Sequence, residues 1–160
     1  MCYVIHVSLR IILIVAVLAF GGSAFAQTAA VNNNLVFGDV YPGIPKKIDK
    51  KTAGGAAEFV ITGTAGNEVT IDFTLPTYMN DGGLHMQMIF QSTDCAIDSS
   101  ATPDQSNPGE DDLNPWHTIT YNLGLNGLTV WLGGTVVPQL SQHPGSYAAL
   151  IVLTVAYSGT

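Results

Sequence analysis

Apolar and polar residues alternate along much of this chain, most clearly in EVTIDFTL at residues 68–75. The apolar residues there occupy every second position, at Val69, Ile71, Phe73 and Leu75. Successive side chains of a β-strand point to opposite faces of its sheet. This period of two therefore predicts a strand with one buried and one solvated face.

Short apolar segments of the same kind recur between turn residues, and helical periodicity is nearly absent. We expect further strands at residues 58–62, 86–91, 118–121, 128–132 and 147–157, with shorter ones at 35–37 and 135–137. About seven or eight strands without helices predict an all-β domain built as a two-sheet sandwich.

The last expected strand, residues 147–157, is apolar on both faces. Its bulkier face should fill the core and consists of Tyr147, Ala149, Ile151, Leu153, Val155 and Tyr157. The other face has Leu150 and Val152 as its sizeable apolar groups, and we expect a long loop or another chain to cover it. A long apolar strand at a sheet edge invites pairing with a second chain, so this strand is also the candidate for assembly.

Residues 92–116 are rich in Ser, Asp, Asn and Pro and predict one long surface loop. Asp104 and Asp112 fall at positions 1 and 9 of a calcium-loop template, but position 12 is Pro115 rather than glutamate. We therefore expect a solvated acidic loop, with a weak extracellular calcium site as the alternative. Trp116 ends the segment and either anchors the loop or presents a ring for stacking on a sugar.

The N-terminal segment predicts export. Arg10 precedes an unbroken apolar run at residues 11–20, and Ala24-Phe25-Ala26 follows, which is typical of a cleaved secretory signal peptide at residues 1–26. The run is shorter than the roughly 20 residues that span a bilayer, so we expect no membrane span in the mature chain. A short polar leader at 27–34 and a single sandwich domain at 35–160 would remain.

Charge and cysteine content narrow the function further. The formal net charge is −7, and Lys46, Lys47, Lys50 and Lys51 are the basic residues outside the signal peptide. A basic footprint for nucleic acid is therefore missing. Cys95 would be the one cysteine of the mature chain, so it is either a buried thiol or the site of an intermolecular bridge.

Three stretches carry a likeness to a known family. They are LVFGDVYPG at 35–43, AAEFVITGTAGNEVTIDFTLP at 56–76, and LTVWLGGTVV with HPGSYAALIVLTVAY at 128–157. With these stretches in this order and at this spacing, the chain resembles the secreted bacterial domain of unknown function 4402 family, near the spore-coat-U-like and fimbrial subunit proteins. The resemblance implies an immunoglobulin-like sandwich that is exported and assembled at the cell surface. It assigns no catalytic residues.

Fimbrial subunits of the chaperone and usher type fill a groove beside the last strand with a neighbour's N-terminal extension. Such an extension needs several alternating apolar residues, whereas the leader has only Val31 of that size. This departure favours a domain that is complete by itself.

We therefore expect an exported, non-enzymatic structural or adhesive subunit, located in the periplasm, at the cell surface or outside the cell. Its partners would be other surface subunits, copies of itself or a periplasmic chaperone, and no cofactor is expected. The alternative is a secreted monomer that binds glycan or protein through the 92–116 loop. No nucleophile elbow and no close histidine pair supports an enzyme or a metal site.

Overall fold

The computed structural model of the chain describes residues 4–5 and 27–158. This part of the chain contains no helix, and each of its strand pairings is antiparallel. Apart from β1 (Val4–Ile5), which pairs with β3 (Gly38–Asp39), the predicted signal peptide lies outside the described residues. The structure thus confirms the all-β fold class.

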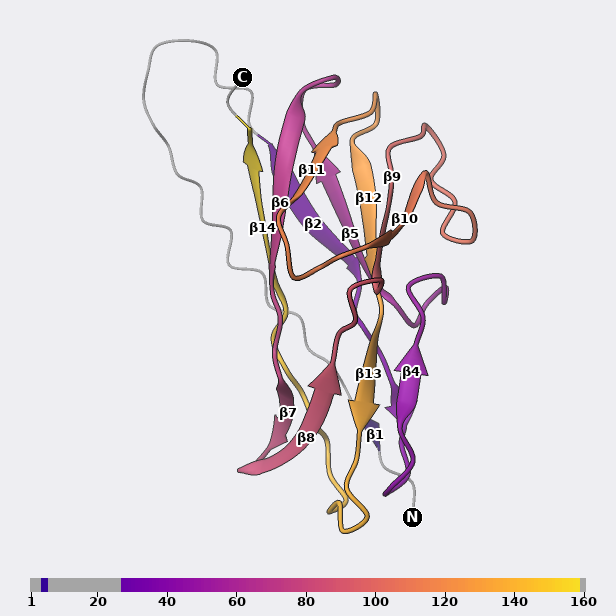
Figure 1. The fold of residues 1–160 in the computed structure, drawn as a ribbon, viewed down its shortest axis with the longest axis vertical. Coiled ribbons are helices and arrows are strands. Elements are labelled where there is room, and N and C mark those ends of the chain that lie inside the picture. The colour runs from indigo at the N-terminus through magenta and orange to yellow at the C-terminus, as the bar shows by residue number, and fades with distance from the viewer. Residues whose placement is uncertain (1–3, 6–26, 159–160) are drawn as a thin grey trace.

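One sheet has five strands in the order β10-β9-β12-β5-β2 (Figure 1). Their bounds are β10 (Glu110–Leu113), β9 (Cys95–Asp98), β12 (Leu128–Leu132), β5 (Ala57–Thr62) and β2 (Thr28–Asn33). The central strand β12 lies between β9 and β5, and all five of its residues are buried.

The remaining strands form two smaller sheets. The first has the order β11-β6-β14, with β11 (Ile119–Asn122), β6 (Glu68–Thr74) and β14 (Val152–Tyr157). The second has the order β4-β13-β8-β7, with β4 (Lys46–Ile48), β13 (Gly134–Val137), β8 (Leu84–Ile89) and β7 (Tyr78–Asp81). This second sheet occupies the lower half of the molecule in Figure 1.

A single core joins the sheets. The largest fully buried side chains are Tyr147, Phe37, Phe59, Leu35, Ile61, Ile71, Met79, Met86, Ile97, Leu128 and Leu132. They come from all three sheets and from the segment before β3. Each large apolar side chain contributes about 1.5–3 kcal/mol on burial, as an upper estimate. The strands therefore pack as a β-sandwich.

Part of the strand order matches the immunoglobulin arrangement. In that fold one sheet reads A-B-E-D and the other contains C-F-G. Here β2, β5, β12 and β9 lie side by side as A, B, E and D, while β6 and β14 lie side by side as C and F. No described strand pairs with β14 on the side where strand G would lie.

Several sequence-based boundaries need correction. Residues 28–33, which we took for a leader outside the domain, form β2 and pair with β5. Residues 35–37 form no strand, although Leu35 and Phe37 are buried. The strands also outnumber the expected seven or eight, because the short strands β2, β3, β7, β9 and β10 were not expected from the sequence.

Residues 92–116 are not one continuous loop. They contain β9, whose four residues are all buried, and β10, which pairs with it. The apolar segment at residues 95–97 is short and lies between Asp94 and Asp98, so the sequence gives little signal for a strand there. Pairing with β12 on one side and β10 on the other makes it a strand.

Candidate functional site

The open edge of β14 is the feature of this fold most suited to a partner. β14 pairs with β6 along one side, and no described strand lies along its other side. The Ser158 N–H donates to Glu68 O at 3.1 Å, and these residues directly follow the Tyr157–Val69 pair in the register. Antiparallel ladders use alternate residues. The peptide groups of Leu153, Val155 and Tyr157 therefore point outward.

A side chain from the neighbouring sheet caps one of these outward groups. Gln27, just before β2, donates its Nε2–H to Val155 O at 2.6 Å. Its Oε1 is buried without a hydrogen-bond partner. A buried amide oxygen in this state costs free energy, so the hydrogen bond from Gln27 to Val155 O stabilises the monomer only weakly.

The two faces of residues 147–157 have different surroundings. On the first face, Tyr147, Ile151 and Leu153 are buried, and Ala149, Val155 and Tyr157 pack against the core, as we predicted. On the second face, Leu150 is 40% exposed and both Thr154 and Ala156 are exposed. The long segment does not cover this face, contrary to one of our two expectations. Regular pairing with β6 begins only at Val152, although Ala148 bridges to Asn80 of β7.

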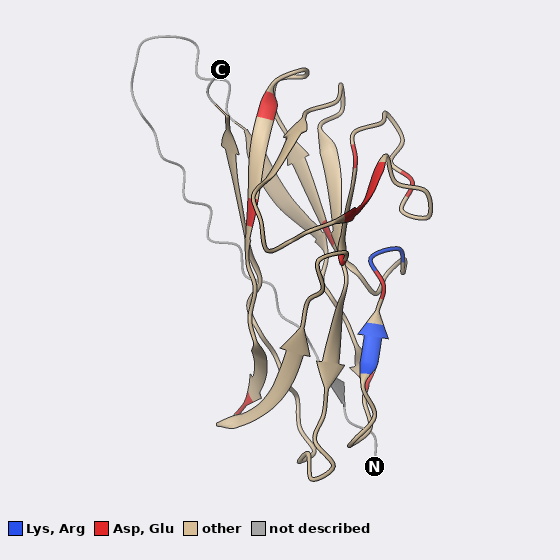
Figure 2. Cartoon of the chain, in the orientation of Figure 1, with Lys and Arg blue, Asp and Glu red and all other residues tan. Residues whose placement is uncertain are grey.

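The edges at β4, β7, β10 and β11 are better protected than β14, and β2, the remaining edge of the five-stranded sheet, is uncharged like β14 but has an irregular register between Val31 and Asn33. Edge strands resist foreign pairing through charged side chains, irregular register, short length or covering segments. β4 carries Lys46 and Lys47, and β10 carries three acidic residues and an irregular register. β11 has four residues, and Ala148 covers part of β7. β14 has six residues without a charge or a proline, as the uncharged strand in Figure 2 shows.

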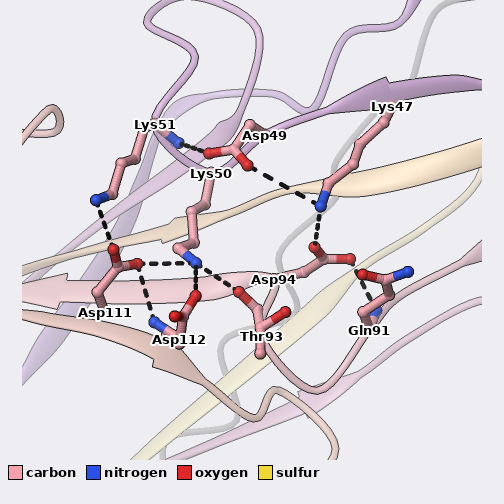
Figure 3. Close-up of polar contacts among 9 residues, drawn as sticks. All are labelled: Lys47, Asp49, Lys50, Lys51, Gln91, Thr93, Asp94, Asp111 and Asp112. Carbon is pink, nitrogen blue, oxygen red and sulfur yellow. Dashed lines mark hydrogen bonds and ion pairs between the residues drawn. The ribbon is translucent and has the colours of Figure 1, made fainter.

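A cluster of lysines and aspartates ties the turn after β4 to the five-stranded sheet (Figure 3). Lys50 is only 6% exposed, and its Nζ lies 2.8 Å from Asp111 Oδ1, 2.5 Å from Asp112 Oδ1 and 2.6 Å from Thr93 O. Lys51 also pairs with Asp111, at 2.5 Å. Lys50 is therefore a buried charge, whereas Lys51 pairs with Asp111 at the surface.

The ion pairs of this cluster shift the pKa values of its members. Burial alone would lower the pKa of Lys50, but hydrogen bonds to Asp111 and Asp112 outweigh it and raise that pKa. Burial alone would raise the pKa of Asp111, but the hydrogen bonds from Lys50 and Lys51 lower it to about 2. Both groups are therefore charged over the whole neutral range, and the cluster is structural.

The structure does not bring Asp104 and Asp112 together as ligands. Asp104 accepts hydrogen bonds from the Ser106 backbone N–H at 2.9 Å and from its hydroxyl at 2.6 Å. Asp112 pairs with Lys50. Asp98, which we had not singled out, accepts the backbone N–H groups of Ser100 and Asp104. Within residues 27–158 no three His, Cys, Asp or Glu residues are grouped to hold a metal ion.

Trp116 combines an anchor with an exposed ring. Its indole N–H donates to Phe90 O at 2.8 Å, and its ring meets the Phe90 ring edge-on with centroids 6.4 Å apart. The side chain is nevertheless 51% exposed. One edge of the ring thus fixes the segment while the rest faces solvent, and stacking on a sugar stays a prediction.

Cys95 lies in the core, with 0% exposure. Burial raises the pKa of its thiol to about 12. A disulfide forms through the thiolate, and this thiol is neither ionised at neutral pH nor accessible. The structure therefore favours the buried alternative over the intermolecular bridge.

The family described as Domain of unknown function (DUF4402) matches residues 46–157, from the start of β4 to the end of β14. The chain belongs to this family. Two of the three stretches that suggested the DUF4402 family lie inside the match, whereas LVFGDVYPG at 35–43 lies before it. A search of curated proteins finds no match. The part of the chain that the structure describes has no helix long and apolar enough to cross a membrane.

No structural role was assigned to Gln27 or to Lys50 from the sequence. Gln27 gave no signal, because its position beside Val155 depends on how two sheets pack together. Lys50 could have been suspected, since the acidic residues 110–112 are the natural partners for four clustered lysines.

Proposed function

We propose that this protein is an exported, non-enzymatic structural or adhesive subunit of the cell surface, related to spore-coat-U-like and fimbrial proteins. The observation that carries the proposal is the unprotected outer edge of β14, which offers the peptide groups of Leu153, Val155 and Tyr157 for added strand pairing. A protein with such an edge either pairs it or aggregates. Membership of DUF4402 names no activity.

In this proposal the N-terminal segment directs export, and a periplasmic chaperone protects the edge until assembly. The test is fractionation of cells that express the full-length chain, followed by size analysis of each fraction without heating. The expected result is protein in the exported or surface fraction, in assemblies larger than one chain. Protein confined to the cytoplasm would contradict the proposal.

One observation favours a second function, the binding of glycan or protein by a monomer. The half-exposed ring of Trp116 is suited to stacking on a sugar face. A glycan array probed with wild type and with Trp116→Ala tests this function, and Leu125→Ala, at another exposed hydrophobic residue, serves as a surface control. Equal signals from wild type and Trp116→Ala would contradict glycan binding through Trp116.

A further inference from the structure

We propose that two copies of this chain associate through β14, so that their two β11-β6-β14 sheets become one continuous six-stranded sheet. The two β14 strands would run antiparallel about a twofold axis. This inference rests on the proposed function and names the partner of the assembly edge as a second copy.

The outward peptide groups of β14 are self-complementary. A twofold axis through Val155 places it opposite the partner's Val155 and places Leu153 opposite the partner's Tyr157. These are the three residues whose N–H and C=O groups point away from β6. Each outward group then finds a partner of the opposite kind, as an antiparallel ladder requires. A closed twofold contact also stops at two copies, whereas an unmatched edge would keep adding chains.

The composition of β14 also favours pairing with itself. Its sequence VLTVAY has no charged residue, so no like charges would face one another across the twofold axis. Thr154 and Ala156 are exposed and small, and they would lie side by side on the outer face of the joined sheet. β-Branched and aromatic residues suit such a central position.

The described residues offer no free extension that could fill the edge instead. Residues 28–33, the segment next to the predicted cleavage site, are already paired with β5 as β2. If residues 28–33 were donated to another subunit, the five-stranded sheet would lose its edge strand β2. Pairing between two β14 edges leaves both domains intact.

Gln27 competes with this pairing. Its Nε2–H occupies Val155 O, and that carbonyl must accept a backbone N–H of the second copy in the dimer. The amide must therefore move away when the chains associate. Gln27→Ala removes the competitor and should lower the dimer dissociation constant by about threefold to tenfold, the equivalent of one ordinary hydrogen bond.

Disulfide trapping tests the register directly. Thr154 would lie opposite the partner's Ala156 in a non-hydrogen-bonded pair, with Cα atoms about 4.5 Å apart. That separation falls within the range that a disulfide spans. The double variant Thr154→Cys with Ala156→Cys should form a covalent dimer when the mature chain, residues 27–160 without Cys2, is oxidised with copper–phenanthroline. Buried Cys95 should not interfere.

The two single variants are the matched controls. In the proposed register Thr154→Cys faces the partner's unchanged Ala156, and Ala156→Cys faces the partner's unchanged Thr154. Both should stay monomeric on a denaturing gel. Equal cross-linking of a single and the double variant would overturn the register. Circular dichroism should confirm that each variant keeps its β-sheet content.

A second variant tests the contact without cysteine chemistry. Thr154→Lys places a charge on an exposed position of β14. It should raise the dimer dissociation constant at least tenfold, as measured by light scattering. The surface substitution Thr120→Lys, on β11 of the same sheet, should leave the dimer unchanged. A dimer dissociation constant that is unchanged by Thr154→Lys would overturn the inference.

The inference and the proposed function fail in different ways. A chain that forms surface assemblies in cells but is monomeric when purified, with no cross-link, would overturn the twofold contact and leave the proposed function standing. A chain that dimerises through β14 but never leaves the cytoplasm would overturn the proposed function and leave the twofold contact standing.

Discussion

Lys50 shows how one residue can differ from what its sequence neighbours suggest. It lies among four clustered lysines, yet its ammonium group is enclosed by Asp111, Asp112 and Thr93 O. Taking such a charge out of water is costly, and it is offset only where the partners are in place. The stability of the turn after β4 therefore depends on this one side chain.

Lys50→Ala should destabilise the fold by about 2–3 kcal/mol, somewhat less than a fully buried pair because Asp112 remains exposed to water. Lys50→Met should cost less than the alanine variant, since it keeps the buried apolar stem. Urea unfolding measures both. Lys46→Ala is the control and should change stability by less than about 0.5 kcal/mol. Equal stability of the wild type and Lys50→Ala would contradict this account.

Asp111 should make the fold sensitive to acid. Its pKa is lowered to about 2 in the fold and is about 3.9 in an unfolded chain. The stabilisation is therefore complete above about pH 5 and is lost as the pH falls from about 4 to 2. Because Asp111 is about one-third exposed, we expect a loss of about 1 kcal/mol.

Urea midpoints at pH 6, 4 and 2.5 measure this loss, and Asp111→Asn is the matched variant. It should be less stable than wild type at pH 6, and the difference should shrink toward pH 2.5. Parallel pH profiles for the two proteins would show that Asp111 does not contribute.

At the scale of elements, β12 and β13 are one strand path that changes sheets at Gly133. β12 belongs to the five-stranded sheet and β13 to the four-stranded sheet. The turn after β4 packs against this junction. A Cβ atom on Gly133 would lie 2.6 Å from Ile48 O and 2.7 Å from Lys50 N. Both contacts are with backbone, which cannot rotate away, so the junction requires glycine.

Gly133→Ala should therefore destabilise the fold by about 1–3 kcal/mol through overpacking. Thermal and urea unfolding measure the effect. Gly109→Ala is the control, because a Cβ there meets no atom closer than 3.6 Å. Similar unfolding midpoints for the two variants would rule out a special role for the junction.

At the scale of the whole molecule, the acidic surface opposes the association that the β14 edge favours. The formal net charge is −7, so two copies repel one another at long range. β14 itself is uncharged. Salt should therefore screen the repulsion without weakening the contact.

The dimer dissociation constant should fall severalfold between low salt and 0.3 M NaCl, as measured by analytical ultracentrifugation. Sodium sulfate at equal ionic strength should lower it further, because sulfate strengthens apolar burial. A dissociation constant that rises with salt would mean that ion pairs, rather than an uncharged strand edge, hold the two copies together.

The fold class could be predicted from the pattern of the residues, because a period of two, as in EVTIDFTL, is typical of a half-buried strand and helical periodicity is nearly absent. The sequence also indicated the core face of residues 147–157 and the family. Three features became visible only in the folded molecule: residues 28–33 are a strand, Cys95–Asp98 is an interior strand, and Lys50 is buried. Those features depend on contacts between residues far apart in the chain, and local periodicity carries no record of such contacts.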